Sequence, residues 1–494
     1  MTRIISVVVA AACAAACTQT PPERQVIDDA VAAMGGAARI QGVRTIVMEG
    51  AGMNGAMGGS ATPDAPPNTF KVTDYRRTLD LANGRMRLQQ VRTAQFAFAN
   101  ATVVRQDQRL DGDLAFNVAA AAAGATQAPL QRASEAASQQ RRREMLEHPV
   151  ALLRAALDPA AKIGNLRQED GQPHVDITTA RGDVLTLAID PATKRPTHVA
   201  HAEYDPNWGD VIVETTFADF EEVGGLQLPK RFTTKTDRFT TADITLSRNQ
   251  ADVEAEDLAA PGEVRAAPLP QPPPINVTVE EVGRGIWWLA GGTHHSVVFE
   301  FADHLTLFEV PLTDARTQAV IAKAKTLVPT KPLTHAIVSH HHLDHAGGFR
   351  AAVAEGLTII THRGNEAFFK EIASRPHTRG QDALSRNPKT PVFQLMDEGL
   401  TLKDAANEVI LYKANGNIHS GLLVFAWVPR DRTLVQADFY DLNWQQHPWG
   451  DNFIENVKAQ KLNPARHLPI HGRIQTHAEV LKTLAEKPKA PPAT

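Results

Sequence analysis

Apolar and polar residues alternate in short segments over the first half of the chain. The clearest of these segments are residues 43–48, 85–89, 184–188 and 211–217. A period of two residues predicts strands with one buried and one wet face, so this half should form an antiparallel β-sheet. Around residues 133–157 the pattern is helical instead, and Pro149 should break that helix because proline lacks the backbone donor.

The second half begins with a different order of elements. Its first strand candidates are residues 277–282, 285–289, 297–301 and 305–310. A helix over residues 316–327 and a further apolar run, Ala336–Val338, follow them. Strands that come first, with helices interleaved afterwards, indicate a second α+β unit and not a continuation of the first sheet.

The length of the chain also favours two folded units. Its 494 residues exceed the roughly 250–300 residues that a single hydrophobic core usually serves. Residues 256–275 are rich in proline, which predicts a stiff, extended linker. We therefore expect an N-terminal β-rich domain over 18–255 and a second domain over 276–490 that folds without the first. Residues 50–67, rich in glycine and proline, should form a mobile loop.

Composition gives no sign of a nucleic-acid partner. The chain has 51 Lys and Arg against 55 Asp and Glu, a formal charge of −4. Without a basic excess, neither nucleic acid nor an anionic membrane surface is an expected partner. The sequence does not indicate an oligomeric state.

The first seventeen residues have the features of an export signal. Arg3 precedes an apolar stretch that is too short to span a bilayer, and small residues precede Cys17. Cys17 resembles the lipid-modified first residue of a mature bacterial lipoprotein, although Ala14 stands where leucine is usual. We predict an exported protein that is periplasmic, secreted, or attached to a membrane through a lipidated Cys17. The only other cysteine is Cys13, so the mature chain has none to bind a metal.

The strongest candidate for chemistry is a histidine cluster directly after Ala336–Val338. Residues 340–345 read His-His-His-Leu-Asp-His, which contains the spacing His340-x-His342-x-Asp344-His345. Such closely spaced groups can converge only if a strand ends and its loop turns back on itself. Imidazole and carboxylate ligands favour zinc, and less decisively iron or manganese, over calcium or magnesium.

This hexapeptide resembles the hallmark HxHxDH of the metallo-β-lactamase superfamily, which is followed by a distant His, Asp and His. The resemblance covers about residues 276–490 and implies an αββα sandwich with its ligands on loops at one edge. It also implies two metal ions, whose ligands are His340, His342 and His419 for the first, Asp344, His345 and His471 for the second, and Asp438 bridging both. The short interval between Asp438 and His471 leaves no room for the inserted domain of the RNA-cleaving branch.

The implied cofactor is zinc, with two ions. Two ions that share a water lower its pKa and direct hydroxide at a carbonyl or phosphoryl centre. We therefore predict a hydrolase that acts on a small-molecule ester, lactone or amide, with β-lactams among the candidates. Asp438 would bridge the ions, and Asp344 would orient the nucleophile or take up a proton. Tyr440 would either contact a developing oxyanion or simply pack in the core.

Two other functions stay open. A single iron in the same fold would support oxygen-dependent chemistry, as in thiol dioxygenase relatives, although the full second ligand set argues against it. Alternatively, the N-terminal domain binds a lipid or a protein and the metal domain is auxiliary; this domain loosely resembles the periplasmic lipoprotein-carrier fold. His294, His295 and His362 should lie near the active face, as partners of the ligands or contacts of the substrate.

Overall fold

The computed structural model describes residues 20–96, 103–119, 128–254, 256–440 and 449–486. The predicted export signal and Cys17 lie outside these ranges. Within them, no helix is long and apolar enough to cross a membrane.

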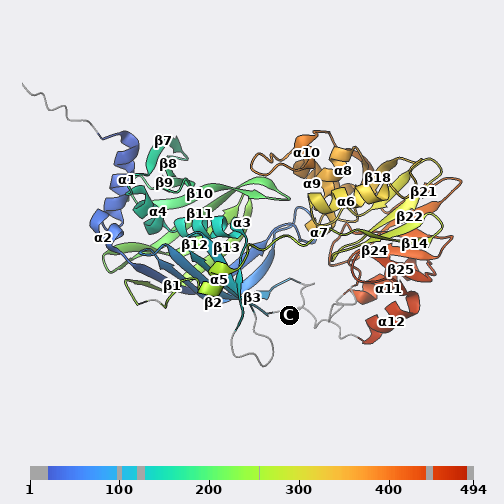
Figure 1. The fold of residues 1–494 in the computed structure, drawn as a ribbon, viewed down its shortest axis with the longest axis horizontal. Coiled ribbons are helices and arrows are strands. Elements are labelled where there is room, and N and C mark those ends of the chain that lie inside the picture. The colour runs from blue at the N-terminus through green and yellow to red at the C-terminus, as the bar shows by residue number, and fades with distance from the viewer. Residues whose placement is uncertain (1–19, 97–102, 120–127, 255, 441–448, 487–494) are drawn as a thin grey trace, which may run out of the picture.

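The first part of the chain forms one large antiparallel sheet, as its alternating pattern predicts (Figure 1). In space its strands follow the order β6-β5-β4-β3-β2-β1-β13-β12-β11-β10-β9-β8-β7. The strands are β1 (Thr45–Ala56), β2 (Asn68–Asp80), β3 (Arg85–Ala94), β4 (Val103–Asp111), β5 (Leu114–Val118), β6 (Leu130–Arg132), β7 (Lys162–Glu169), β8 (Gln172–Thr178), β9 (Val184–Ile189), β10 (Pro196–Asp205), β11 (Gly209–Val223), β12 (Leu226–Thr236) and β13 (Phe239–Ala251). We call residues 20–254 the sheet unit.

Helices cover one face of this sheet. They are α1 (Pro22–Ala33), α2 (Ala37–Gly42), α3 (Glu135–Leu146) and α4 (Pro149–Ala156). The predicted helical stretch is broken where expected, and Pro149 begins α4, where its missing donor costs nothing. Val150, Leu152 and Leu153 of α4 are fully buried in one cluster with apolar side chains of the sheet, so this helix anchors the core of the sheet unit.

The second part of the chain contains two further sheets. One has the order β14-β15-β16-β17-β18-β19-β20 and the other β21-β22-β23-β24-β25-β26. Their strands are β14 (Thr278–Gly283), β15 (Ile286–Ala290), β16 (Ser296–Glu300), β17 (Leu305–Phe308), β18 (Leu333–Ile337), β19 (Thr358–His362), β20 (Val392–Met396), β21 (Gly399–Lys403), β22 (Glu408–Lys413), β23 (Val424–Val428), β24 (Thr433–Gln436), β25 (Arg466–Pro469) and β26 (Gln475–Thr476). The helices are α6 (Asp314–Ala324), α7 (Leu343–Ala346), α8 (Phe349–Glu355), α9 (Glu366–Ser374), α10 (Ala383–Arg386), α11 (Gly450–Ala459) and α12 (His477–Glu486), with a 3₁₀ turn, η1, at Arg363–Asn365.

These two sheets pack face to face with helices outside. Phe299 of the first sheet and Leu411 of the second belong to one buried cluster between them. The outer face of the first sheet packs against helices such as α8, through Phe349, and that of the second against α11, through Phe453. The predicted αββα sandwich and the α+β class are therefore confirmed. We call residues 278–486 the sandwich unit.

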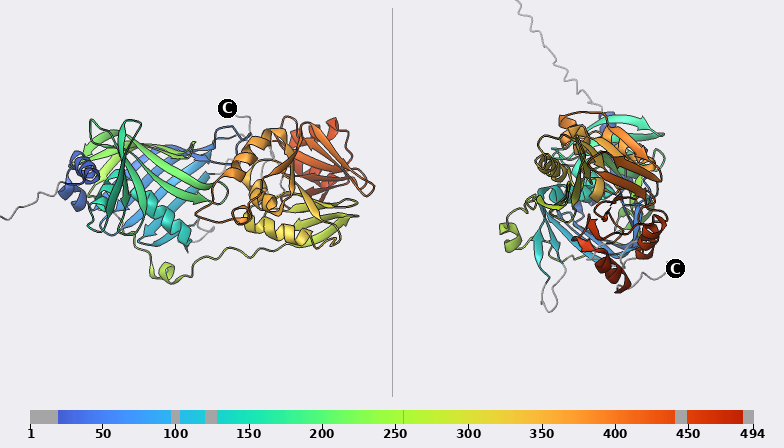
Figure 2. Two further views of the ribbon diagram at one scale, coloured as in Figure 1. Left: turned by 90° about the horizontal axis from the view of Figure 1, so that it is seen from above. Right: turned by 90° about the vertical axis from the view of Figure 1, so that its right-hand side faces the viewer.

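The segment between the units differs from the extended linker that its prolines suggest. Gly262–Ala266 form a short helix, α5, whose Val264 is buried against Phe116 of the sheet unit. Ala260 N also donates to Asp111 Oδ2 at 2.8 Å. Residues 267–277 have no regular structure and run along the outside of the molecule (Figure 2). A buried apolar contact and a hydrogen bond thus fix the first half of this segment to the sheet unit.

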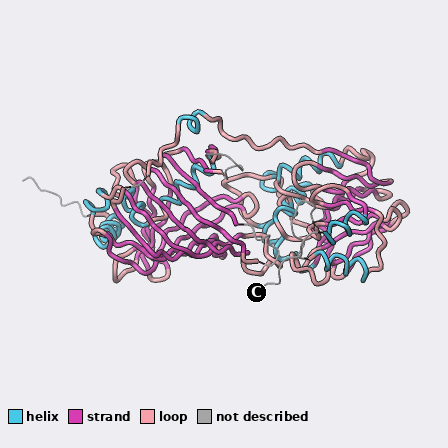
Figure 3. The backbone as a smooth tube through the Cα atoms, turned by 90° about the horizontal axis from the view of Figure 1, so that it is seen from below, coloured by secondary structure: helices cyan, strands magenta, loops and turns pink. Residues whose placement is uncertain are grey.

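The two units also share a buried apolar contact. Trp208 and Val211 of the sheet unit belong to the same cluster as Phe368 of α9, and the ring centroids of Trp208 and Phe368 are 5.7 Å apart. Around it, Asp210 N donates to Pro376 O at 2.8 Å. Figure 3 shows that loops at the ends of the large sheet meet loops and helices of the sandwich unit. A fragment that contains the sandwich unit alone would expose this apolar patch to water, and this exposure opposes independent folding of the fragment.

Candidate metal centre

Parallel strand pairs bring the predicted ligands to one edge of the sandwich. In the first sheet β17 and β18 are parallel, and the histidine cluster follows β18. In the second sheet β24 and β25 are parallel, with Asp438 after the first and His471 after the second. Because the carboxyl ends of parallel strands lie at the same edge, residues far apart in sequence meet there.

One group of four side chains includes the first two histidines of the HxHxDH motif. It consists of His340, His342, His419 and Asp438. All four residues are buried, and their ligand atoms lie within 4.8 Å of one another. Buried imidazole and carboxylate groups at such spacing match the donor set of a zinc site.

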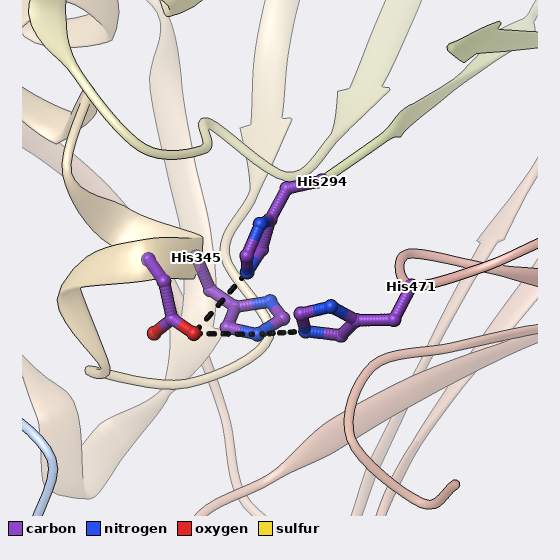
Figure 4. Close-up of side chains that lie close together, drawn as sticks. His294, His345 and His471 are labelled. Carbon is purple, nitrogen blue, oxygen red and sulfur yellow. Dashed lines mark hydrogen bonds and ion pairs between the residues drawn. The ribbon is translucent and has the colours of Figure 1, made fainter. Parts of the chain in front are cut away.

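A second group lies beside the first. It consists of His294, Asp344, His345 and His471. The rings of His294, His345 and His471 converge (Figure 4), and the ring centroids of His294 and His471 are 4.0 Å apart. His294 Nε2 lies 3.2 Å from Asp344 Oδ2, so this group holds one histidine more than the resemblance implied. The sequence placed His294 near the active face, but no spacing rule assigned it to a metal.

Asp438 lies between the two groups. Its Oδ2 is 2.7 Å from His419 Nε2, and 3.0 Å from His345 Nε2. Its Oδ1 is 2.8 Å from His471 Nε2. One carboxylate thus contacts imidazoles of both groups, which is the position that a bridging ligand requires.

The electrostatics of the centre favour cations. Burial opposes charge on His345, yet the carboxylates of Asp438 and Asp344 raise its pKa well above the ordinary value. Burial and the neighbouring His345 lower the pKa of His340 to about 3, so its ring stays neutral and keeps a lone pair for coordination. The residues present therefore fit a metal: carboxylates that demand positive charge, and neutral imidazoles that can ligate it.

A buried glutamate that the sequence reasoning missed orients His345. Glu309 follows β17, is fully buried, and has a φ of 75°, a conformation that glutamate seldom adopts. His345 Nδ1–H donates to Glu309 Oε2 at 2.8 Å, and Ser339 N donates to its Oε1 at 2.8 Å. This leaves His345 Nε2 as the ligand atom. The sequence feature that could have identified Glu309 is its position as a charged residue directly after the apolar run Leu305–Phe308.

The sheet unit reaches this centre through the β1–β2 hairpin. Its tip is residues 57–67; the remainder of the predicted loop, from Gly50 to Ala56, is strand. His342 Nε2 donates to the carbonyl oxygen of Ser60 in this tip at 2.8 Å. A proton on Nε2 leaves Nδ1 as the metal-binding atom of His342. The tautomer of a candidate ligand is therefore set by a residue of the other unit.

Close packing holds the hairpin tip on the metal loop. Gly58 has a φ of +77°, and a Cβ atom there would lie 2.4 Å from Leu343 Cδ1. Leu343 N donates to Gly58 O at 3.3 Å, and Gly421 N donates to Ala61 O at 2.9 Å. Glycine suits position 58 because its positive φ is one that other residues rarely adopt, and because an added Cβ would force the Leu343 side chain to move.

The other residues considered from sequence have structural roles. His295 Nε2 donates to Gly472 O at 2.9 Å and so holds the turn after His471. His362 caps the 3₁₀ turn η1 by accepting from Gly364 N at 3.0 Å and belongs to neither group. Tyr440 is 1% exposed and packs against Phe453, which fits the packing alternative and places it in the core.

No protein-family model matches the chain, and no curated protein matches its sequence. Solved structures similar to it include metallo-beta-lactamases from Pontibacter korlensis, Erythrobacter litoralis and Hirschia baltica. Their identities are 16%, 16% and 19%, with TM-scores of 0.34, 0.32 and 0.32. The similarity covers 42%, 42% and 43% of this chain and 98%, 95% and 99% of those chains. It is thus confined to less than half of this chain.

We predict that Glu309→Gln weakens metal binding by the second group. The amide cannot accept from both His345 Nδ1 and Ser339 N, so the imidazole loses its fixed tautomer. Loss of such a partner typically lowers metal affinity about 10–100-fold. Competition with a chromophoric chelator measures the affinity of each ion. A variant that binds both ions as tightly as the wild type would contradict this role for Glu309.

We predict that Gly58→Val displaces the hairpin tip and weakens metal binding by the first group, by about tenfold or more, because His342 loses the Ser60 carbonyl. The matched control is Gly59→Ala: the nearest atom to its added Cβ would be Asn68 Nδ2, at an ordinary 3.5 Å. The same chelator competition applies. Equal affinities in the two variants would show that the sheet unit does not orient His342.

Proposed function

We propose that the chain is a metal-dependent hydrolase that holds two divalent cations, zinc being the first candidate, and cleaves a small-molecule ester, lactone or amide. The observation that carries this proposal is the contact of Asp438 with imidazoles of both groups, at 2.7–3.0 Å. When bound, two such ions would supply an activated water and polarise the electrophilic oxygen. The apolar stretch before Cys17 supports export as part of the proposal.

The donor set supports zinc. Both groups consist of imidazoles and carboxylates, without a cysteine, and such ligands suit zinc better than the harder cations calcium and magnesium. Iron and manganese remain compatible with the same atoms. The second complete group favours two ions over the single iron of an oxygenase.

Asp438 and Asp344 take different roles in this proposal because their exposure differs. The Asp438 side chain is 3% exposed and surrounded by imidazoles, which suits a ligand that holds the centre together. The Asp344 side chain is 49% exposed, so one oxygen is accessible from the solvent side. Asp344 would orient the attacking water, and His294, 3.2 Å away, would hold its carboxylate in place. His294 thereby becomes a positioning residue or a further ligand of the second group.

The first test of the proposal separates hydrolysis from oxygen chemistry. A panel of esters, lactones, β-lactams and other amides should contain at least one compound that the purified chain cleaves. Turnover should be lost on treatment with a chelator, return with zinc, and proceed equally under anaerobic conditions. Activity that requires oxygen and follows iron content would overturn the hydrolase assignment in favour of a mononuclear oxygenase.

A second test concerns the bridge. Asp438→Ala should lower metal content below two equivalents and reduce kcat/KM by at least about 100-fold. This effect should be larger than that of removing a residue that only hydrogen-bonds a ligand, which typically costs about 10–100-fold. The control is His362→Ala, which removes an imidazole outside both groups and should leave both quantities unchanged. Elemental analysis and steady-state kinetics measure them. Two equivalents of metal with full activity in the Asp438 variant would show that the bridge is assigned wrongly.

A further inference from the structure

The sheet unit contains a large cavity that is separate from the metal centre. It has a volume of about 610 Å³ and lies between the sheet and α3, with side chains of β1, β2, β3 and β10–β13 in its wall. Small-molecule sites commonly have volumes of about 300–1,000 Å³. The cavity is therefore large enough for a metabolite-sized compound.

Polar side chains dominate the wall where β3 passes. Leu88, Gln90 and Arg92 all line the cavity, because alternate residues of a strand face the same side. Gln108 of the neighbouring strand joins them. Such a wall suits a polar ligand and would be costly to cover with an acyl chain, because its amides and guanidinium would lose water without gaining partners.

The acidic groups of the wall already have hydrogen-bond donors. These groups are Glu144, Glu147, Glu203 and Asp205. Their donors are Gln140 for Glu144, His201 and Thr215 for Glu147, Arg143 for Glu203, and the backbone N–H groups of Asn207 and Trp208 for Asp205, at distances of 2.7–3.1 Å. The carboxylates of the cavity are thus occupied by the protein itself.

Arg92 is the exception among the charged groups. Its guanidinium lies over the ring of Phe70, 4.2 Å from the centroid, and its Nε is buried without a hydrogen-bond partner. Among the described residues no carboxylate forms an ion pair with it, and burial alone lowers the pKa of Arg92. The other arginine of the wall, Arg77, is instead balanced by Glu144 and Glu147. Other wall atoms also lack a hydrogen-bond partner, among them Asn54 Oδ1 and both ring nitrogens of His148. Among the described residues, Arg92 is nevertheless the cation of the wall that no carboxylate balances.

We propose that this cavity is a binding site for a small organic carboxylate, which Arg92 holds through its guanidinium. The planar fork of arginine matches a carboxylate, and a partly buried ion pair of this kind is stronger than a neutral hydrogen bond. The inference is independent of the metal-dependent activity. It also differs from a lipid-carrying role for this domain, because the unbalanced positive charge of Arg92 favours an anionic group in the cavity.

The test is calorimetric titration of the full chain with benzoate, phthalate and glutarate as probes, and with laurate as the acyl comparison. At least one of the three small carboxylates should bind, and Arg92→Gln should raise its Kd about 10–100-fold. Arg92→Lys keeps the charge without the fork and should give an intermediate Kd. Circular dichroism and thermal melting establish that each variant is folded.

Arg105→Gln is the matched control, since Arg105 is exposed on the adjacent strand and pairs in register with Val91, which has the opposite orientation to Arg92. It should leave the Kd unchanged. No binding by any of the small carboxylates, or equal weakening by the Arg92 and Arg105 variants, would overturn the proposal. So would tight binding of laurate that is insensitive to Arg92→Gln, because that result would identify an acyl-chain cavity.

Discussion

A carboxylate buried among imidazoles is the interaction on which the sandwich unit depends. Asp438 is 2% exposed, and taking such a charge out of water costs several kcal/mol unless positive charge surrounds it. Imidazoles from three separate loops supply that environment, so these loops must end at the same place. Both Asp438 and Glu309 adopt positive φ angles, of 55° and 75°, a backbone strain of about 1–3 kcal/mol each that the packed sheets must hold. Packing in the cores of the two sheets thus holds the carboxylates of Asp438 and Glu309 next to the imidazoles of the centre.

The same centre makes the two units interdependent. Ser60 lies in the sheet unit, yet its carbonyl fixes the tautomer of His342, and Trp208 completes an apolar cluster with α9. The active face implied by the metal groups is therefore built from both units, although every candidate ligand belongs to one. The sheet unit would act on the proposed chemistry through orientation of a candidate ligand, while its own cavity is separate from the metal centre.

Sequence reasoning located most of the candidate site because strand ends and short-range spacing are local properties. The cluster from His340 to His345 converges within one turn, and Asp438 and His471 each follow a recognisable apolar run. Glu309 and His294 were not assigned, since their roles depend on which strands become parallel neighbours, and no residue spacing encodes that. The contact between Ser60 and His342 was beyond reach for the same reason: their sequence separation of 282 residues is bridged only by docking of the two units. The linker was misjudged because proline content does not reveal that Val264 has a partner in Phe116.

The path of the linker has a consequence for how firmly the hairpin must bind. Residues 267–277 run along the outside of the molecule (Figure 2), whereas the hairpin tip makes its own bonds to Leu343 and Gly421, so tethering and docking are separate. A short tether holds two surfaces at an effective concentration on the order of millimolar. A hairpin contact whose dissociation constant is well below that value would therefore be formed most of the time in the intact chain. The same contact could be too weak to hold the two units together if they were separate molecules at micromolar concentration. The surface around Ser60 can therefore be small and polar and still keep His342 in place.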